Sequence, residues 1–321
     1  MTWRQFRAQT WIATVLVAAG GALLALTVHS VAAAYRDSGL AGCSADCARA
    51  VDGFTARLQA GNLISIHDAL TGLLYVCPAL IGIFWGAPLI ARELETGTHG
   101  LVWSQSVTRT RWLATKLVIV GGAAAASVGA LSWATTAWAS HIDQVGGGRL
   151  SPLLFAGRGL VPVGYALFAF MLGVTLGMVI RRTVPAMAAT LAVYIGAAIA
   201  MPLWLRGHLV PAAHSTMPLN TDWVSGISVG PGGLRLVTQP HIPGAWVLAS
   251  RILTPTGQPL TGAGAEQHCG SAVGSQQCFD WIGSLGLREE LTLHPANHFW
   301  PLQFAESGLF LAVSVLLAAF C

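Results

Sequence analysis

Six apolar runs, each of about 20 residues or more, constrain this chain more than any other feature. The runs lie at residues 11–34, 70–91, 117–140, 159–180, 183–205 and 300–321. A helix of about 20 apolar residues is long enough to cross the hydrocarbon core of a bilayer. Only 9% of the residues are charged, whereas soluble domains carry roughly a quarter. The sequence therefore predicts an all-α polytopic membrane protein with six transmembrane helices.

The polar segments between these runs complete the predicted layout. Residues 1–10 mix aromatic and basic side chains, which is typical of a helix lying in the membrane interface. A cleaved signal peptide is the alternative, but the run at 11–34 exceeds the apolar core of about 7–15 residues found in signal peptides. Residues 35–69 and 141–158 are predicted loops, and 181–182 a tight turn. Residues 206–299 carry turn signals between β-prone runs, which predicts a small domain with some β structure before the last helix.

The positions of the basic residues predict the orientation of the chain. Cytoplasmic loops are enriched in Arg and Lys close to the ends of membrane helices. With the N-terminus in the cytoplasm, the inner segments would hold Arg4, Arg7, Arg92, Arg109, Arg111, Lys116, Arg181 and Arg182. We therefore predict a multi-pass protein of the cytoplasmic (plasma) membrane, with 35–69, 141–158 and 206–299 on the outer side.

Four of the six cysteines lie in the two long polar segments. Cys43 and Cys47 belong to the first, Cys269 and Cys278 to the second. Cysteines concentrated in this way indicate an oxidising compartment. Of the three ways to connect them, we favour the local pairs Cys43–Cys47 and Cys269–Cys278, with free thiols as the alternative. Both predicted pairs fall on the outer side.

The sequence shows little that resembles catalytic or cofactor chemistry. No G-x-x-x-x-G-K-[ST] phosphate loop is present, so ATP and Mg²⁺ are expected in a partner subunit and not in this chain. His294 and His298 are separated by Pro295 and have no evident third ligand, so we expect no metal site. The basic residues are dispersed, and no nucleic-acid partner is expected. The lipid bilayer is the expected surrounding.

Glu306 is a candidate outer gate near the start of the last apolar run. It follows Phe299-Trp300-Pro301 and could gate the outer mouth or bind a cationic substrate; it could equally lie solvated at the interface. The only other ionisable residue within a predicted span is His29. Proton-coupled carriers usually hold acids at mid-membrane, so the sequence disfavours secondary transport.

The segment 92–116 is a charged island between two predicted spans. We expect the second helix to continue to Glu95 and break at Gly97, followed by a short apolar helix that includes Trp103. Aromatic and Arg side chains are the usual anchors of protein interfaces. The segment could therefore dock a soluble partner, or it could be an ordinary hairpin whose charges only fix topology.

This segment resembles the corresponding part of ABC-2 type transporter permeases. The resemblance rests on the run Arg92-Glu93-Leu94-Glu95-Thr96-Gly97-Thr98, on Ser106-Val107-Thr108-Arg109-Thr110-Arg111, and on Lys116. Phe84–Leu89 and Arg181–Met187 are similar to segments of actinobacterial members. The layout of six spans, with an outer insertion before the last one, also matches and extends the resemblance over the whole chain.

The resemblance implies a function and a set of contact residues. Segment 92–116 would be the coupling helix region that contacts an ABC ATP-binding subunit, through Glu93, Glu95, Gly97, Thr98, Trp103, Arg109 and Arg111. Two permease copies would pair as a homodimer and export a lipophilic or amphipathic compound, such as an antibiotic or drug. The alternative is a membrane sensor or anchor whose outer domain binds a ligand and signals inward without transport.

Overall fold

The computed structural model describes residues 2–43, 47–97, 108–145, 148–230, 233–240, 242–258, 260, 268–269 and 275–321. The chain divides into two compact units. The helical unit comprises Met1–Leu209 and Trp300–Cys321, and the second unit comprises Val210–Phe299. Each unit is described by itself.

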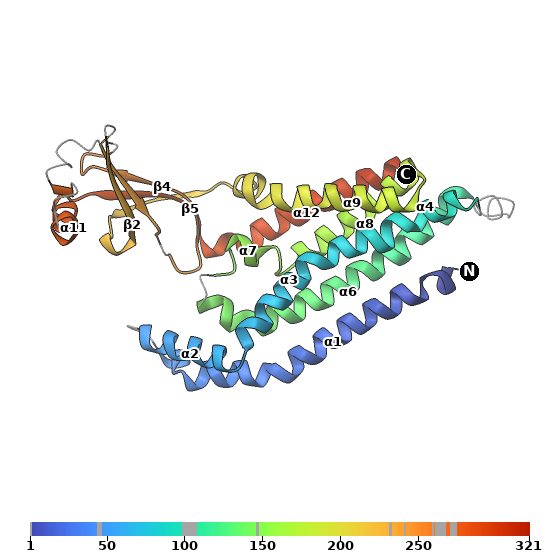
Figure 1. The fold of residues 1–321 in the computed structure, drawn as a ribbon, viewed down its shortest axis with the longest axis horizontal. Coiled ribbons are helices and arrows are strands. Elements are labelled where there is room, and N and C mark those ends of the chain that lie inside the picture. The colour runs from blue at the N-terminus through green and yellow to red at the C-terminus, as the bar shows by residue number, and fades with distance from the viewer. Residues whose placement is uncertain are drawn as a thin grey trace. The chain divides into compact units, whose positions relative to one another are not determined.

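The helical unit begins with α1, which runs from Thr2 to Asp37 (Figure 1). A separate helix over 1–10 was predicted, but α1 continues through residue 10 without interruption. The physical reason is local, because residues 2–10 contain neither the Gly nor the Pro that commonly ends a helix. Helix α2 (Ala48–Ala60) then occupies part of the predicted loop 35–69. The side chains of Phe54 and Leu58 on this helix are buried.

The second spanning segment is assembled from three helical pieces. These are α3 (Leu63–Ile81), the π-helical turn η2 (Gly82–Gly86) and α4 (Ala87–Glu95). The π-helical turn ends two residues before Pro88, whose ring would clash with the carbonyl four residues earlier in a regular helix. The segment begins seven residues before the predicted start at 70, so His67 and Asp68 belong to this helix and not to a loop.

Four further long helices belong to the described part of this unit. Helix α6 (Arg109–Val145) exceeds the predicted run 117–140 at both ends, and α8 spans Val161–Ile180. Helix α9 (Thr183–Ala200) continues through the π-helical turn η3 (Met201–Leu205) and the 3₁₀ turn η4 (Arg206–His208), and α12 spans Phe299–Phe320. Within the described part of the chain, six helices are long and apolar enough to cross a membrane, which confirms the predicted fold class.

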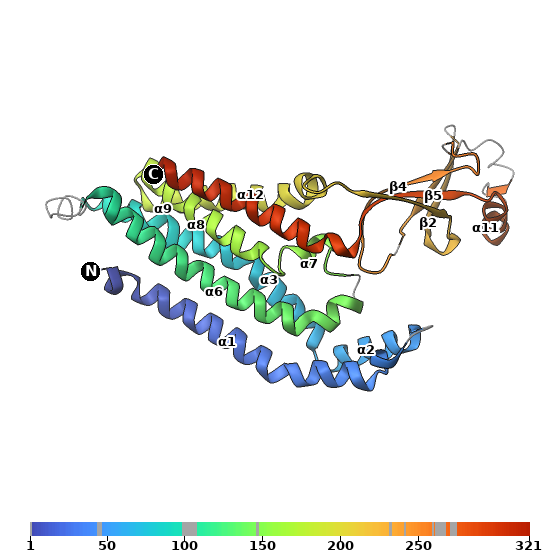
Figure 2. The same cartoon turned by 180° about the vertical axis from the view of Figure 1, so that it is seen from behind.

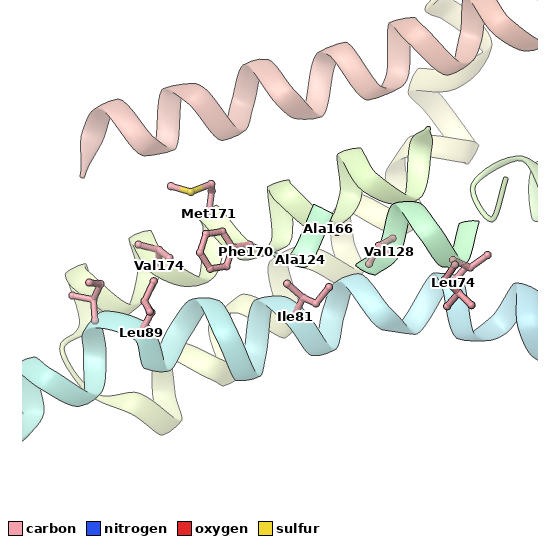
Figure 3. Close-up of a cluster of buried hydrophobic side chains, with 11 residues drawn as sticks. Leu74, Ile81, Leu89, Ala124, Val128, Ala166, Phe170, Met171 and Val174 are labelled. Atoms are coloured by element: carbon pink, nitrogen blue, oxygen red, sulfur yellow. The ribbon is translucent and has the colours of Figure 1, made fainter. Parts of the chain in front are cut away.

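Helix α8 is the central helix of the bundle. In its apolar window 67% of the residues are buried, against 22% for the windows of α1 and α9. Figure 3 shows Phe170, Met171 and Val174 of α8 packed with side chains of α3, α4 and α6. Helix α1 lies at the edge of the bundle beside α6 in both views (Figures 1 and 2). The core is therefore built around α8.

Glycines allow α8 to approach the α3–η2–α4 segment at backbone distance. A Cβ atom added at Gly82 would lie 2.7 Å from the Ala169 carbonyl oxygen, and one added at Gly177 would lie 2.5 Å from that of Ala87. Small residues permit such packing between membrane helices. The Gly/Ala-rich run of α6 is less crowded, since a Cβ added at Gly122 would meet nothing within 4 Å.

The second unit contains the expected β structure. Three antiparallel strands form a sheet of order β1-β5-β4: β1 (Ala213–Pro218), β5 (Arg288–His294) and β4 (Trp246–Leu253). Strands β2 (Val224–Gly230) and β3 (Gly233–Thr238) form a separate hairpin, and α11 spans Ser275–Ser284.

Two disulfides confirm the predicted local pairing. Cys269 is bonded to Cys278 within the second unit, and Cys43 to Cys47 just before α2. The buried Cys278 packs with Ile282 and Leu287 in a small hydrophobic cluster. This disulfide therefore joins Cys269 to α11 beside the hydrophobic cluster.

Candidate functional site

The charged segment 92–116 lies where α4 ends and α6 begins. Helix α4 ends at Glu95 and Gly97 adopts a φ of 71°, as the sequence predicted, because glycine tolerates the left-handed backbone that ends a helix. Thr98 and Trp103 lie outside the described residues. The chain is described again from Thr108, whose side-chain oxygen accepts a hydrogen bond from the Arg111 amide (3.4 Å) and so caps α6.

Glu93 forms an ion pair with Lys116 between α4 and α6. The Lys116 ammonium donates to Glu93 Oε1 and also lies 4.1 Å from the centre of the Trp112 ring. The side chains are only 4% (Lys116) and 14% (Glu93) exposed. Ion pairs shielded in this way are screened much less by salt than surface pairs. This contact ties the first turns of α6 to the last turn of α4.

Glu95 joins the same end of α4 to α9. Its Oε2 accepts hydrogen bonds from the Thr183 backbone amide (3.0 Å) and from the Thr183 hydroxyl (2.7 Å). The first amides of a helix lack partners within the helix, and a carboxylate there also meets the positive end of the helix dipole. Glu95 therefore caps α9 from a different helix. We call this region, with Glu93, Glu95, Lys116 and Thr183, the 92–116 end of the bundle.

Several basic residues also lie at this end, among them the predicted contact residues Arg109 and Arg111. Arg111 is exposed on the first turn of α6, and Arg109 is the first residue of that helix. Arg181 and Arg182 form the predicted tight turn between α8 and α9, and both are exposed. This end therefore combines internal contacts of two carboxylates with exposed basic side chains. Contact with an ATPase subunit stays a prediction for all of these residues.

A second set of polar residues lies at the opposite end of the bundle. Arg158 donates from Nε to Asp143 Oδ2 (2.8 Å) and from Nη2 to Asp143 Oδ1 (3.2 Å), and both side chains are fully buried. Its Nη1 also donates to the Thr71 hydroxyl (3.1 Å). His67 joins the pair, since its Nε2 lies 2.9 Å from Asp143 Oδ1 and 2.7 Å from Arg158 Nη2. This network connects α3, the end of α6 and the chain before α8.

Glu306 forms a second buried pair at this end, with Arg206. The Arg206 Nε and Nη2 atoms donate to the two carboxylate oxygens of Glu306 at 2.7 and 3.0 Å, and neither residue is exposed. The Tyr165 hydroxyl adds a third hydrogen bond to Glu306 (3.1 Å). Of the two interpretations offered by the sequence, the solvated one is wrong, because Glu306 faces a guanidinium inside the bundle. We call this region, with Asp143, Arg158, Arg206 and Glu306, the far end.

Gln303, one turn before Glu306 on α12, completes the far end. Its Oε1 accepts from the amides of Leu160 (2.8 Å) and Val161 (3.0 Å), which satisfies unpaired donors at the start of α8. Gly159 precedes these residues with a φ of 63°. A Cβ atom there would lie 2.8 Å from Gln303 Oε1, so glycine is required by both the backbone and the contact.

Most of the ionisable residues of the far end were not predicted from the sequence. Only Glu306 and His29 were counted as ionisable groups within spans, whereas His67, Asp143 and Arg206 also lie in candidate spanning helices. The reason is that the predicted spans 70–91, 117–140 and 183–205 are shorter than the helices Leu63–Glu95, Thr110–Asp143 and Thr183–His208. A signal was available, since a carboxylate such as Glu306 inside an apolar run needs a cation nearby. Arg206 follows the fifth run directly and was the obvious choice.

The architecture of the helical unit defines the class of the protein. Six apolar helices and buried polar groups paired within the bundle are the features of a multi-pass membrane protein. A family model described as "ABC-2 membrane transporter related" matches residues 14–206, which is more than half of the chain. The chain belongs to this family. No curated protein and no solved structure matches it.

Membership of this family supports a membrane permease component, and the family implies partnership with an ATP-binding subunit. The matched region ends at Arg206 and therefore covers α2 to α9 together with most of α1. The β-containing unit and α12 lie beyond it. Glu93 and Glu95 fall within the matched region, while Glu306, which pairs with its last residue, falls outside.

Proposed function

We propose that this protein is the membrane subunit of an ATP-driven exporter and that the 92–116 end receives force from a separate ATPase subunit. The observation that carries the proposal is the pair of contacts made by α4. Glu93 holds α6 through Lys116, and Glu95 holds α9 through Thr183. A displacement of this end of α4 would therefore move three membrane helices together.

The packing of the bundle supports transmission along α4. The α3–η2–α4 segment contacts α8 through glycines at backbone distance, so its movement cannot be absorbed by flexible side chains between the helices. Packed elements of this kind shift as bodies because interiors are dense. The far end is held by two bidentate Arg–carboxylate pairs. Force entering at the 92–116 end would thus act against a fixed far end.

The finer assignments belong to the same proposal. ATP and Mg²⁺ are bound by the partner, two permease copies work as a homodimer, and the N-terminus lies in the cytoplasm of a cell whose plasma membrane the chain crosses. The cargo is a lipophilic or amphipathic compound, such as an antibiotic or drug. The support for the orientation is the clustering of Arg and Lys in the short segments at the 92–116 end.

Co-purification with the ATPase subunit tests the proposal. The double variant Trp103→Ala with Arg109→Glu changes an aromatic residue and a basic residue of segment 92–116. We expect it to lose ATPase binding and cargo-stimulated ATP hydrolysis. Retention of both activities would contradict docking at this segment. ATP-dependent uptake by inverted vesicles separates the exporter from a sensor or anchor, which would move no cargo.

A matched control uses a charge reversal at the other end of the bundle. Arg57 lies on α2, where it is exposed. Arg57→Glu alters the net charge as Arg109→Glu does but should leave ATPase binding intact. Equal loss in both variants would point to a general charge effect and count against a specific docking surface.

A further inference from the structure

A cavity of about 630 Å³ lies at the far end of the helical unit. Its walls come from α2, α3, the end of α6 and the first residues of α7 (Pro152–Phe155). Ligand cavities for drug-sized molecules have volumes of about 300–1,000 Å³. Apolar side chains form most of the surface, among them Val51, Ile64 and Leu153.

Three hydroxyl groups around this cavity already donate hydrogen bonds within the protein. Thr55 donates to the Val51 carbonyl (2.9 Å) and Thr71 to the His67 carbonyl (2.8 Å). The Tyr75 hydroxyl donates to the Leu153 carbonyl (2.9 Å). Donation from these three hydroxyls to a ligand would require breaking existing bonds, although their oxygens can still accept. We therefore expect the apolar walls and the charged groups to select the ligand.

The charged groups leave one carboxylate in excess. No Lys or Arg occurs among the described residues that line the cavity. Arg158 lies next to it but is paired with Asp143 through both carboxylate oxygens. The second carboxylate, Asp68, lines the cavity with its side chain 71% exposed. The cavity therefore carries a net charge of about −1 when His67 is neutral.

His67 holds this carboxylate in place. Asp68 Oδ1 lies 3.1 Å from His67 Nδ1, on the opposite side of the ring from the Arg158–Asp143 pair. An ionised carboxylate can only accept, so the contact between His67 Nδ1 and Asp68 Oδ1 is a hydrogen bond donated by the Nδ1–H group of His67. The buried network thus positions an exposed anion at an apolar cavity.

We propose that this cavity binds lipophilic cations, with the apolar body of the ligand against Val51, Ile64 and Leu153 and its amine at Asp68. The inference rests on the proposed export function and assigns it a substrate class. It does not depend on the ATPase, because the cavity lies within one chain. Asp68 would be the residue that discriminates cations from neutral compounds.

Equilibrium binding of two dyes to the full chain in phosphatidylcholine nanodiscs tests this proposal. Rhodamine 6G is a lipophilic cation and Nile red is a neutral lipophilic dye, and fluorescence anisotropy, corrected with empty nanodiscs, reports both. Asp68→Asn should weaken rhodamine 6G binding by up to about fivefold, the scale of a partly exposed ion pair, and leave Nile red binding unchanged. Asp52→Asn, an exposed carboxylate on α2 that does not line the cavity, is the control.

A second pair of variants tests the cavity itself. Gly72 lines the cavity, Gly53 on α2 does not, and a Cβ atom at either position meets nothing within 4 Å. Gly72→Phe should abolish saturable binding of both dyes, whereas Gly53→Phe should not. Unchanged rhodamine 6G binding in Gly72→Phe would overturn the site.

Equal effects of Asp68→Asn on both dyes would overturn the preference for cations. Both measurements are made without ATP and without the ATPase. Failure of the chain to bind an ATPase would therefore contradict the export function and leave the outcome of the dye titrations unaffected.

Discussion

The two ends of the helical bundle use charge in different ways. At the far end, two Arg–carboxylate pairs are fully buried and bidentate. At the 92–116 end, Glu93 is partly shielded and pairs with Lys116 of α6, while Glu95 is exposed and accepts hydrogen bonds from Thr183 of α9. Buried charges must be paired because desolvation is costly, whereas exposed ones exchange partners readily. The far end is thus suited to holding helices together, and the 92–116 end to changing its contacts.

The largest expected effect follows from breaking a pair at the far end. Glu306→Ala leaves the buried Arg206 guanidinium without its counter-ion, which costs about 3–5 kcal/mol in buried pairs. Thermal melting of the purified protein in detergent measures the loss. Arg206→Met combined with Glu306→Leu removes both charges and should regain most of the stability. A Glu306→Ala protein that melts like the wild type would show that the far end does not depend on this pair.

The second effect tests the close helix packing that connects the two ends. A Cβ atom at Gly86 would overlap the Phe170 carbonyl of α8, so Gly86→Ala forces the helices apart and should cost about 1–3 kcal/mol. Gly122→Ala is the matched control, because its Cβ enters open space, and alanine there should stabilise the helix by up to about 1 kcal/mol. Opposite shifts in melting temperature are expected. Shifts of the same sign would contradict the packing.

The third effect concerns the shielded pair of the 92–116 end. Lys116→Met removes a charged hydrogen bond to Glu93, which should cost about 2 kcal/mol. Arg111→Met, at an exposed position of the same helix, should change the stability by no more than about 0.5 kcal/mol. Thermal melting compares the two. A loss for Lys116→Met as large as that for Glu306→Ala would remove the difference between the two ends.

The smallest effect is expected at Glu95, which is exposed. Glu95→Ala deprives the Thr183 amide of its acceptor, so hydrogen exchange at the start of α9 should become faster while the melting temperature changes least of the four variants. Asp37→Ala, at the exposed end of α1, is the control and should leave exchange at Thr183 unaltered. Unchanged exchange in Glu95→Ala would mean that the carboxylate does not cap α9.

Much of the fold was predictable because its signals are local. Runs of about 20 apolar residues are recognised from composition alone, and the end of α4 at Glu95 and the turn at Gly97 follow from one glycine. Local pairing of the cysteines was likewise the favoured prediction, because the members of each pair lie close together in the sequence. The candidate site was harder. Asp143 and His67 are 76 residues apart in the chain. The residues next to each of them in the sequence do not indicate that the two side chains meet.

The sequence by itself determined that this chain spans a membrane with six helices, that a small β-containing unit precedes the last helix, and that the family is one of ABC-2 transporters. Apolar length and short motifs suffice for that. Only the tertiary structure decided which charges meet: Arg206 with Glu306, and Lys116 with Glu93. The physical reason is that desolvation makes a buried charge dependent on a partner, while the location of that partner depends on how distant helices pack.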